Sequence, residues 1–303
     1  METTPRTSEN GPVTVGVDGS DAARTAALWA AGEAVRRDRP LHVVHGGDTD
    51  GRNLYLTAAT LDGIRGAGRE LLAATARAVT AEHPGLDVTT EYSSADPVTS
   101  LYRAGGLYGT VVVGHRGLGG FHSLLLGSVG LGIAAIARTP VVVVRGVGEG
   151  EERGAVVAAV RDGNDLVCAR HAARGAELRK ATLSLRHVWN VLESVGNVIP
   201  MLDAMAGLAG EHERVLTSLT DTVREEFPGL TVEGEADKSV SVAGVLVEAS
   251  RGADLLVMGG RRAPGRLGLG RNLGRVTHTL LHHAHCPVLL VPRTTAGDAA
   301  GPP

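Results

Sequence analysis

Aromatic residues are scarce in this sequence, and so are cysteines and long apolar runs. Phe, Trp and Tyr make up 3% of the 303 residues, so the core must be built mainly from Ala, Val and Leu. The two cysteines, Cys168 and Cys286, are too few for a disulfide framework and form no Cys-x-x-Cys pair, which favours a reducing cytoplasm. No apolar run approaches the roughly 20 residues of a membrane-spanning helix, and the polar N-terminus lacks the apolar core of a secretory signal. The sequence therefore predicts a cytoplasmic protein with no membrane partner.

An excess of positive charge is also missing. Lys and Arg number 30 against 33 Asp and Glu, which gives a net charge of −3. A nucleic-acid binder that works through a global basic field is therefore excluded. With 43% hydrophobic and 21% charged residues, the composition is that of an ordinary globular protein. The length corresponds to about two domains.

A long repeat sets the organisation of the chain. Thr110–Arg145 and Leu255–Arg293 each contain an apolar run, a loop rich in Gly and Arg, a helix-compatible stretch, a proline and a second apolar run. The two prolines, Pro140 and Pro287, lie one domain length apart, which indicates a duplicated domain and not a solenoid of short repeats.

The duplication predicts two domains, at residues 12–146 and 154–293, joined by a charged, glycine-rich segment around 146–154. Residues 1–11 and 294–303 are polar and are predicted to be disordered tails.

Strand-like and helix-like segments alternate in both halves. The fourth and fifth apolar runs of the first half are almost continuous valine, which indicates strands buried on both faces of a parallel sheet. The predicted fold is therefore α/β: two tandem doubly wound domains with helices on both faces of each sheet. Helices are expected from Ser20 or Asp21, over Ala58–His83, and from Asp96-Pro97. The expected strands are Val13–Asp18, Leu41–His45, Val88–Tyr92, Thr110–Val113 and Val141–Val144, then Ala155–Val160, Leu183–Val188, Leu230–Glu233, Leu255–Met258 and Val288–Val291.

One glycine pattern carries the chemistry of the first half. Gly114 and Gly117 follow the fourth strand, and nine residues later come Gly127 and Ser128. Ligands of open α/β sheets bind beyond the carboxyl ends of the strands. Glycines there let a phosphate approach the backbone, and the N–H groups of Gly127, Ser128 and Val129 open a helix, whose dipole attracts anions. The pattern therefore predicts a phosphate cradle.

Asp18 is expected at the same edge, at the end of the first strand, where its carboxylate could accept hydrogen bonds from a ribose or an adenine amino group. The pattern is not a Walker A loop, because no Gly-Lys-Ser/Thr follows the glycines. It is not a dinucleotide fingerprint either, because the first turn reads VDGSDAA. A glycine-rich turn that merely packs is the alternative; the spacing, Ser128 and Asp18 together favour binding.

Three segments resemble the ATP-binding branch of the universal stress proteins, in the tandem form found in actinobacteria: VTVGVDGSDAARTAALWAAGEA, LHVVHGG and VVVGHRGLGGFHSLLLGSV. The resemblance covers residues 12–293. It implies a five-stranded parallel sheet of order 3-2-1-4-5 in each domain, and ATP with Mg²⁺ or Mn²⁺ over the sheet edge. It implies slow hydrolysis at most. It also implies pairing through the apolar edge strands Val141–Val144 and Val288–Val291, so the two domains are predicted to pair with each other in a pseudo-two-fold arrangement and two chains to form a homodimer. The binding residues it implies are Asp18, Gly46, Gly114, Gly117, Gly127, Ser128 and Val129.

The second half departs from this pattern. Arg161 stands at the position of Asp18, Arg262 at that of Gly117, and Arg275 at that of Ser128. These three losses argue against the same mode of ATP binding. A solvated basic loop is favoured over an anion site for the arginines there, which are Arg261, Arg262, Arg266, Arg271 and Arg275.

Two further candidate sites are weighed and set aside. A metal site at His278 and His282 is not favoured, because no carboxylate or second cysteine lies nearby at ligand spacing. His122 is not favoured as a general base, because no nucleophile accompanies it. The sequence thus predicts an ATP-binding, nucleotide-sensing regulator of stress or dormancy, with ATP in the first domain only. A nucleotide-free scaffold and a slow ATP hydrolase are the alternatives.

Overall fold

The computed structural model describes residues 11–50, 56–107, 109–117, 126–145, 152–190, 202–260 and 273–292. They form two compact units, which lie within Met1–Arg145 and Gly146–Pro303. The two tails expected from the sequence fall outside the described residues except for Gly11, and so does most of the expected boundary. No helix in the described part of the chain is long and apolar enough to cross a bilayer.

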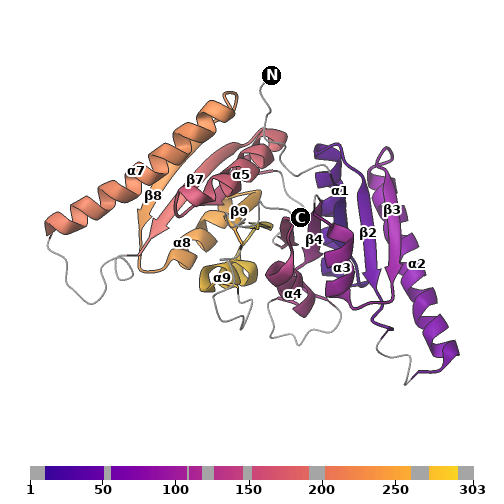
Figure 1. Cartoon of the computed structure of the whole chain (residues 1–303). Coiled ribbons are helices and arrows are strands. Elements are labelled where there is room, and N and C mark those ends of the chain that lie inside the picture. The colour runs from indigo at the N-terminus through magenta and orange to yellow at the C-terminus, as the bar shows by residue number, and fades with distance from the viewer. Residues whose placement is uncertain are drawn as a thin grey trace, which may run out of the picture. The chain divides into compact units, whose positions relative to one another are not determined.

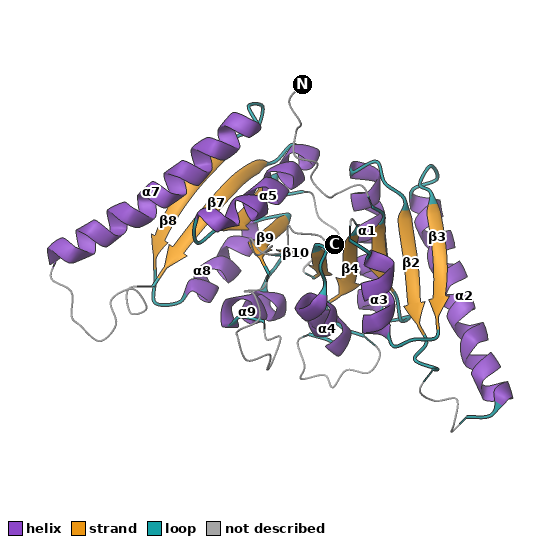
Figure 2. Ribbon diagram, viewed as in Figure 1, coloured by secondary structure: helices purple, strands orange, loops and turns teal. Residues whose placement is uncertain are grey.

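Strands and helices alternate in the first unit, as the sequence predicts (Figure 1). Its strands are all parallel and lie in the order β3-β2-β1-β4-β5, as the family resemblance implies. Helices lie on both sides of the strands (Figure 2), which confirms a doubly wound α/β fold. The elements are β1 Val13–Gly16, α1 Asp21–Arg36, β2 Leu41–Gly46, α2 Ala58–Glu82, β3 Val88–Ser93, α3 Pro97–Gly105, β4 Thr110–Gly114, α4 Ser128–Ile136 and β5 Val141–Val144.

Three helices of the first unit begin at a side-chain cap. The Ser20 hydroxyl accepts a backbone N–H from the first turn of α1. Thr57 caps α2 in the same way, and Asp96 caps α3, with Pro97 at the first helical position. The exception is α4, whose N-cap is Gly127 and which has no side-chain cap. The first turn of α4 therefore presents N–H groups that the helix itself cannot satisfy.

Valine and alanine build the core of this unit. All four residues of β5 and the three valines of β4 are at most 3% exposed, which confirms the expectation that these strands are buried on both faces. The buried residues of α1 are alanines except for Glu33, so the helix lies close to the strands. Its buried alanines are Ala23, Ala26, Ala27, Ala30, Ala31 and Ala34.

The second unit repeats the same order of elements. Its parallel strands lie in the order β8-β7-β6-β9-β10, which is again the 3-2-1-4-5 arrangement. A short 3₁₀ turn, Gly163–Asp165, precedes its first helix. The elements are β6 Ala155–Ala159, α5 Leu166–Arg179, β7 Thr182–Trp189, α7 Leu202–Glu226, β8 Val232–Lys238, α8 Val242–Ala249, β9 Leu255–Gly259, α9 Arg275–His283 and β10 Val288–Val291.

Two expected strand boundaries are wrong. The strand expected at Leu230–Glu233 is Val232–Lys238, and its sequence VEGEADK is polar because β8 is half exposed, with only Val232 buried. β1 ends at Gly16, two residues earlier than expected, so Asp18 lies in the turn that leads to α1 and not at the strand end.

A shared hydrogen bond aligns the two units residue by residue. His45 in β2 donates its Nδ1–H to the Val17 carbonyl oxygen at 2.7 Å, and His187 in β7 donates its Nδ1–H to Val160 at 3.0 Å. Val17 and Val160 are therefore equivalent. It follows that Asp18 corresponds to Arg161, as expected from the sequence.

Behind these histidines the two units are packed differently. In the first unit, Tyr92 on β3 lies beside His45 and fills the space over Gly68 of α2, where any Cβ would lie 2.6 Å from the Tyr92 ring. The 25-residue helix α7 places His212 at the position of Gly68. Strand β8 places Ala236 beside His187, where β3 has Tyr92. The ring that packs beside the shared histidine thus comes from strand β3 in the first unit and from helix α7 in the second.

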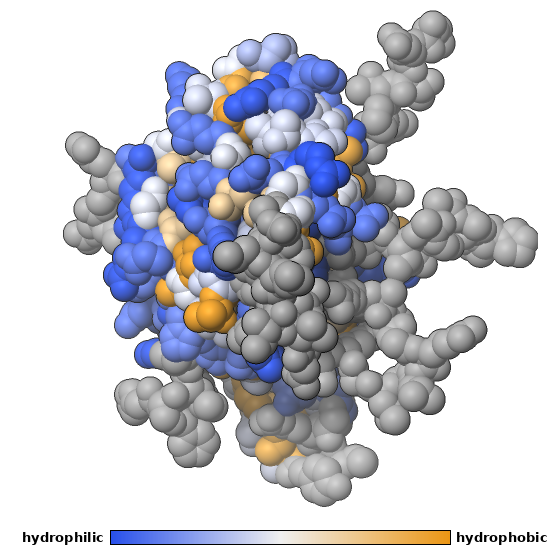
Figure 3. Space-filling view, turned by 90° about the vertical axis from the view of Figure 1, so that its left-hand side faces the viewer, coloured by the Kyte–Doolittle hydropathy of each residue, from blue (hydrophilic) through white to orange (hydrophobic). Residues whose placement is uncertain are grey.

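The surface of the second unit is polar where it can be seen. Figure 3 shows the side of the molecule on which α7 and β8 lie, and most described residues there are hydrophilic, with hydrophobic residues scattered among them. Isolated exposed apolar side chains are ordinary on a protein surface, so the described residues on this face mark no site by themselves.

Candidate functional site

A cavity of about 300 Å³ lies at the carboxyl ends of β1, β2 and β4 in the first unit. In the strand order the chain turns back between β1 and β4, which is where open α/β sheets bind ligands. All seven residues singled out in the sequence line this cavity: Asp18, Gly46, Gly114, Gly117, Gly127, Ser128 and Val129. The structure thus brings them together, while their role in binding stays a prediction.

The cavity wall has an apolar part and a glycine-rich part. The apolar part comes from strand ends and from helices α1 and α3; its side chains are Val17, Ala23, Val44, Pro97, Leu101 and Val113. The glycine-rich part comes from the residues after β4 and from the start of α4. Such a wall suits a ligand that is flat and weakly polar at one end and anionic at the other.

Two contacts shape the glycine-rich part. The Gly127 N–H donates to the His115 carbonyl oxygen at 2.9 Å, which ties the start of α4 to the residues after β4. Gly127 itself is extended, with φ −73° and ψ 154°. The N–H groups of Ser128 and Val129 begin α4 beside the cavity, where the helix dipole favours an anion. The intervening residues 118–125, which include His122, lie outside the described residues.

The glycines of the motif have different reasons to be glycine. A Cβ at Gly114 would lie 2.6 Å from the Ala22 carbonyl oxygen, so this glycine lets α1 pack on β4. A Cβ at Gly46 would lie 2.6 Å from Pro97 Cα, so that glycine lets α3 pack on β2. At Gly127, by contrast, a Cβ would meet its nearest neighbours, Arg116 and Gly117, at 3.7 Å, an ordinary contact. Among the described residues, packing explains Gly114 and Gly46 and gives no reason for a glycine at position 127.

Asp18 is fixed by the residue that caps α1. The Ser20 N–H and hydroxyl donate to Asp18 Oδ1 at 2.9 and 2.7 Å. A Cβ at Gly117 would collide with the other oxygen, Asp18 Oδ2, so this carboxylate packs directly against the glycine turn. Sequence reasoning assigned Ser20 only a capping role. The signal it missed is Asp-Gly-Ser itself, because an Asp side chain in a turn commonly accepts the backbone N–H two residues on.

The two basic residues of the turn point to different places. Arg116 is exposed and is the only lysine or arginine among the described residues that line the cavity. His115 is not part of the wall; its Nδ1 lies 3.3 Å from the Val144 carbonyl oxygen. Burial, together with the charges of Arg145 and Arg116, lowers the pKa of His115 below its usual value, so the ring is neutral at pH 7.

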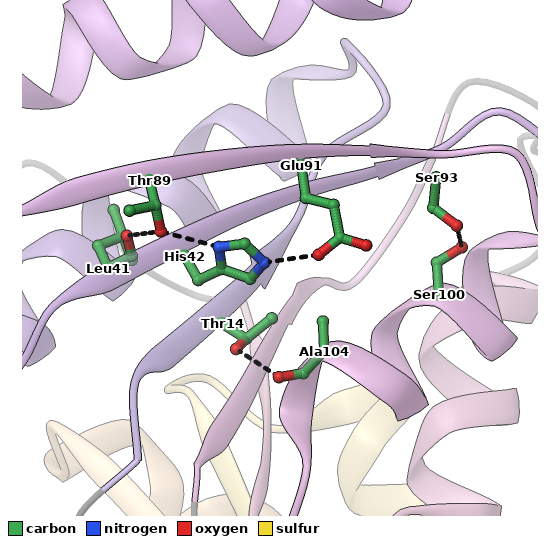
Figure 4. A network of polar contacts seen from close by, with 8 residues as sticks. All are labelled: Thr14, Leu41, His42, Thr89, Glu91, Ser93, Ser100 and Ala104. Carbon is green, nitrogen blue, oxygen red and sulfur yellow. Dashed lines mark hydrogen bonds and ion pairs between the residues drawn. The ribbon is translucent and has the colours of Figure 1, made fainter.

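Polar contacts join β2 to β3, and α3 to β1 and to the end of β3 (Figure 4). The His42 ring bridges Thr89 and Glu91 on β3, at 2.8 and 3.0 Å. The Ser100 hydroxyl of α3 donates to Ser93 Oγ at 2.8 Å, and the Thr14 hydroxyl lies 3.5 Å from the Ala104 carbonyl oxygen. The contacts of Ser100 and Thr14 help to fix α3, which contributes part of the apolar wall.

The second unit builds the equivalent edge differently. Arg161, at the Asp18 position, donates its backbone N–H to Asp165 at 2.9 Å and pairs with the same carboxylate at 3.5 Å. Helix α9 begins at Arg275, after the N-cap Gly274. The arginines Arg261, Arg262, Arg266 and Arg271 lie outside the described residues.

The histidines of α9 do not gather a metal site in the described part of the chain. His278 and His282 stack with their ring centroids 4.3 Å apart. No group of three or more potential ligands that could hold a metal is found among the described residues.

Comparison with known proteins places this fold in a family. The model of the universal stress protein family matches residues 9–145 and again residues 154–292. A universal stress protein of Mycobacterium tuberculosis is 34% identical over 133 residues, which are 44% of this chain and 47% of that protein, so the chain spans about half the length of this relative. A universal stress protein of Mycobacterium bovis is 30% identical over 293 residues, and the match covers 92% of this chain and 96% of that protein.

A solved structure extends the likeness to both units. A universal stress protein from Archaeoglobus fulgidus matches 94% of this chain and 97% of its own, with a TM-score of 0.69 and 16% identity, which is a likeness of fold alone. The family model covers nearly all described residues of both units. The chain therefore belongs to the universal stress protein family and carries two copies of its domain in tandem.

Proposed function

We propose that the first unit binds ATP and that the protein acts as a nucleotide-sensing regulator of stress or dormancy. The observation that carries the proposal is the α4 N-terminus, which has a glycine cap and lies beside an apolar hollow. The adenine would lie against the apolar wall, and the phosphates would accept N–H groups from the glycine turn and from Ser128 and Val129.

Magnesium fits this site as a companion of the nucleotide. Asp18 is the only carboxylate on the described wall of the cavity, and its Oδ1 already accepts two hydrogen bonds from Ser20. The protein therefore offers no carboxylate cage. A Mg²⁺ ion would be held by phosphate oxygens and water, as is usual for this ion in nucleotide sites.

The residues of the cavity wall favour nucleotide sensing over rapid hydrolysis of ATP. His45 is the only histidine among the described lining residues, and its Nδ1–H is committed to the Val17 carbonyl oxygen. Neither His45 nor Asp18 is placed as a base beside a nucleophile in the described residues. We therefore expect slow hydrolysis at most. The homodimer and the cytoplasmic setting stay predictions from the sequence.

Calorimetric titration of the purified chain tests the proposal. ATP with Mg²⁺ should bind at one site per chain, because Arg161 and Arg275 replace Asp18 and Ser128 in the second unit. ADP and cyclic AMP are titrated beside it. Absence of ATP binding would leave a nucleotide-free scaffold, and two ATP molecules per chain would contradict a site in the first unit alone.

Arg116→Gln should weaken ATP binding by about threefold to tenfold and leave adenosine binding unchanged. An exposed guanidinium beside the phosphates contributes a modest, salt-dependent attraction that adenosine does not use. Titrations with both ligands at low and high salt measure the effect. Arg65→Gln, at an exposed position of α2, is the matched control. An equal loss for ATP and adenosine would show that Arg116 does not contact the phosphates.

A further inference from the structure

Ser20 lies where three parts of the first unit meet. Its hydroxyl oxygen accepts the Ala23 N–H at 3.2 Å and so caps α1. The same hydroxyl donates to Asp18 Oδ1 at 2.7 Å, and the Arg116 carbonyl oxygen lies 3.4 Å away as a second, longer acceptor. A hydroxyl has one hydrogen, so the short bond to Asp18 is the principal one. Ser20 thus touches the helix start, the Asp18 carboxylate and the glycine turn.

The Asp18 carboxylate connects Ser20 to the glycine turn. Its Oδ1 is held by both the N–H and the hydroxyl of Ser20, and hydrogen bonds to a charged carboxylate are strong. Its Oδ2 lies so close to Gly117 that a Cβ at this position would collide with it as long as the carboxylate keeps this orientation. The carboxylate therefore packs between the β1–α1 turn, which holds its Oδ1, and the glycine turn, which contacts its Oδ2. If Ser20 releases it, the glycine turn loses the surface on which it rests.

The second unit has lost every member of this arrangement together. With Val17 aligned to Val160, Ser20 corresponds to Gly163 and Asp18 to Arg161. At the position of Gly117 the sequence has Arg262. Asp165 holds the turn there instead, through the Arg161 N–H. The unit that lacks the glycine pattern has thus replaced Ser20 and Asp18 as well.

We propose that Ser20 is a positioning residue of the nucleotide site, which sets the conformation of the Gly114–Gly117 turn by holding Asp18 against Gly117. The inference rests on the proposed function, since the turn is the part of the site that would receive the phosphates. The competing explanation is that Ser20 only caps α1.

Substitutions at two helix caps separate these explanations. Ser20→Gly removes the hydroxyl but keeps a residue that is accepted at an N-cap with little loss of helix stability, and Ser20→Thr restores the hydroxyl. Thr57→Gly makes the same change at the cap of α2, away from the cavity. We expect Ser20→Gly to raise the ATP dissociation constant about tenfold, because a hydrogen bond to a charged group is lost. Ser20→Thr and Thr57→Gly should bind like the wild type.

A second measurement does not depend on ATP. Amide hydrogen exchange of residues 114–117 in the ligand-free protein should be several times faster in Ser20→Gly than in Thr57→Gly or the wild type. Unchanged exchange in Ser20→Gly would overturn the inference whatever the titrations give. Faster exchange in Ser20→Gly with unchanged ATP affinity would contradict the proposal that Ser20 positions the nucleotide site. If the wild type binds no ATP, the proposed function fails, and exchange alone decides whether Ser20 sets the turn.

Discussion

Gly127→Ala should leave the first unit folded and weaken ATP binding by at least about tenfold. Among the described residues the added methyl group meets only ordinary contacts, the nearest at 3.7 Å, and φ at this position is −73°, so the backbone is not strained. The cost to folding is that of alanine at an N-cap, on the order of 1 kcal/mol. One of those 3.7 Å contacts is the Gly117 backbone nitrogen. A phosphate oxygen bound between that N–H and the start of α4 would meet the methyl group, so binding should fall.

Gly114→Ala is the contrasting variant, with a large effect on folding. Its Cβ would lie 2.6 Å from the Ala22 oxygen, 2.7 Å from the Ala22 carbonyl carbon and 3.0 Å from the Ala23 nitrogen. These are backbone atoms of α1, which cannot move without shifting the helix from β4. We expect a loss of about 3 kcal/mol or more in the free energy of unfolding.

Urea unfolding and ATP titration of both variants decide the matter. Gly114→Ala should lose stability and, with it, binding. Gly127→Ala should lose binding with a loss of stability of only about 1 kcal/mol. Wild-type affinity in Gly127→Ala would show that no phosphate lies at the start of α4. A strong loss of stability in Gly127→Ala would show that packing alone explains this glycine as well.

The contrast shows what a glycine pattern in a sequence can and cannot predict. The spacing correctly places Gly114, Gly117 and Gly127 around one cavity, because the strand end and the helix start on either side of the loop have strong local signals. It does not separate Gly114, which is required by packing, from Gly127, which is not. That difference depends on α1, about ninety residues earlier in the chain.

The sequence predicts some strands and helices better than others, because the local signal is strong in some of them and weak in others. Buried strands such as Val141–Val144 were placed correctly, because burial on both faces leaves an apolar run in the sequence. The edge strand Val232–Lys238 was misplaced, because an edge strand pairs on one side only and tolerates Glu, Asp and Lys. Helix α1 was placed correctly by its cap. The contacts that join this cap to the glycine turn, from Ser20 to the Arg116 carbonyl oxygen and from Asp18 to Gly117, are tertiary, and local signals do not reveal them.

The sequence patterns also did not predict that the second unit lacks a counterpart of Tyr92 and has His212 on α7 in its place. As a result, His187 and His212 form a pair of neighbouring histidines. His187 donates Nδ1–H to the Val160 carbonyl oxygen, so its neutral ring must accept at Nε2, where His212 Nδ1 lies at 2.8 Å. His212 in turn stacks on the buried ring of Trp189, with centroids 4.6 Å apart. Protonation of His187 would place two N–H donors against each other.

The surroundings of this pair keep His187 uncharged. Burial lowers the pKa of His187 first of all, and the neighbouring His212 lowers it further; the Val160 carbonyl and the carboxylates of Asp162 and Asp165 oppose the shift without cancelling it. Lys238, whose amino group lies 5.9 Å from the centroid of Trp189, is a further cation at the cluster. His187 therefore binds a proton less readily in the folded protein than in the unfolded chain, where a histidine is protonated near pH 6.5.

The free energy of unfolding should consequently fall when the pH is lowered from 7 to 5. Below about pH 6.5 the unfolded chain binds more protons at this position than the folded chain, so stability rises with pH in that window and levels off above it. His187 contributes at most about 1.4 kcal/mol for each pH unit. His115, whose pKa is also lowered by burial, adds a change of the same sign.

Urea unfolding at pH 5, 6 and 7 of the wild type, His187→Gln and His115→Gln separates the two contributions. Each variant removes one titrating ring, so each should show a smaller fall in stability between pH 7 and pH 5 than the wild type does. Thr57→Gly, which removes no titrating group, serves as the control and should keep the wild-type slope. A His187→Gln protein with the full acid sensitivity of the wild type would show that the proton enters elsewhere, and that the histidine pair accepts charge without loss of packing.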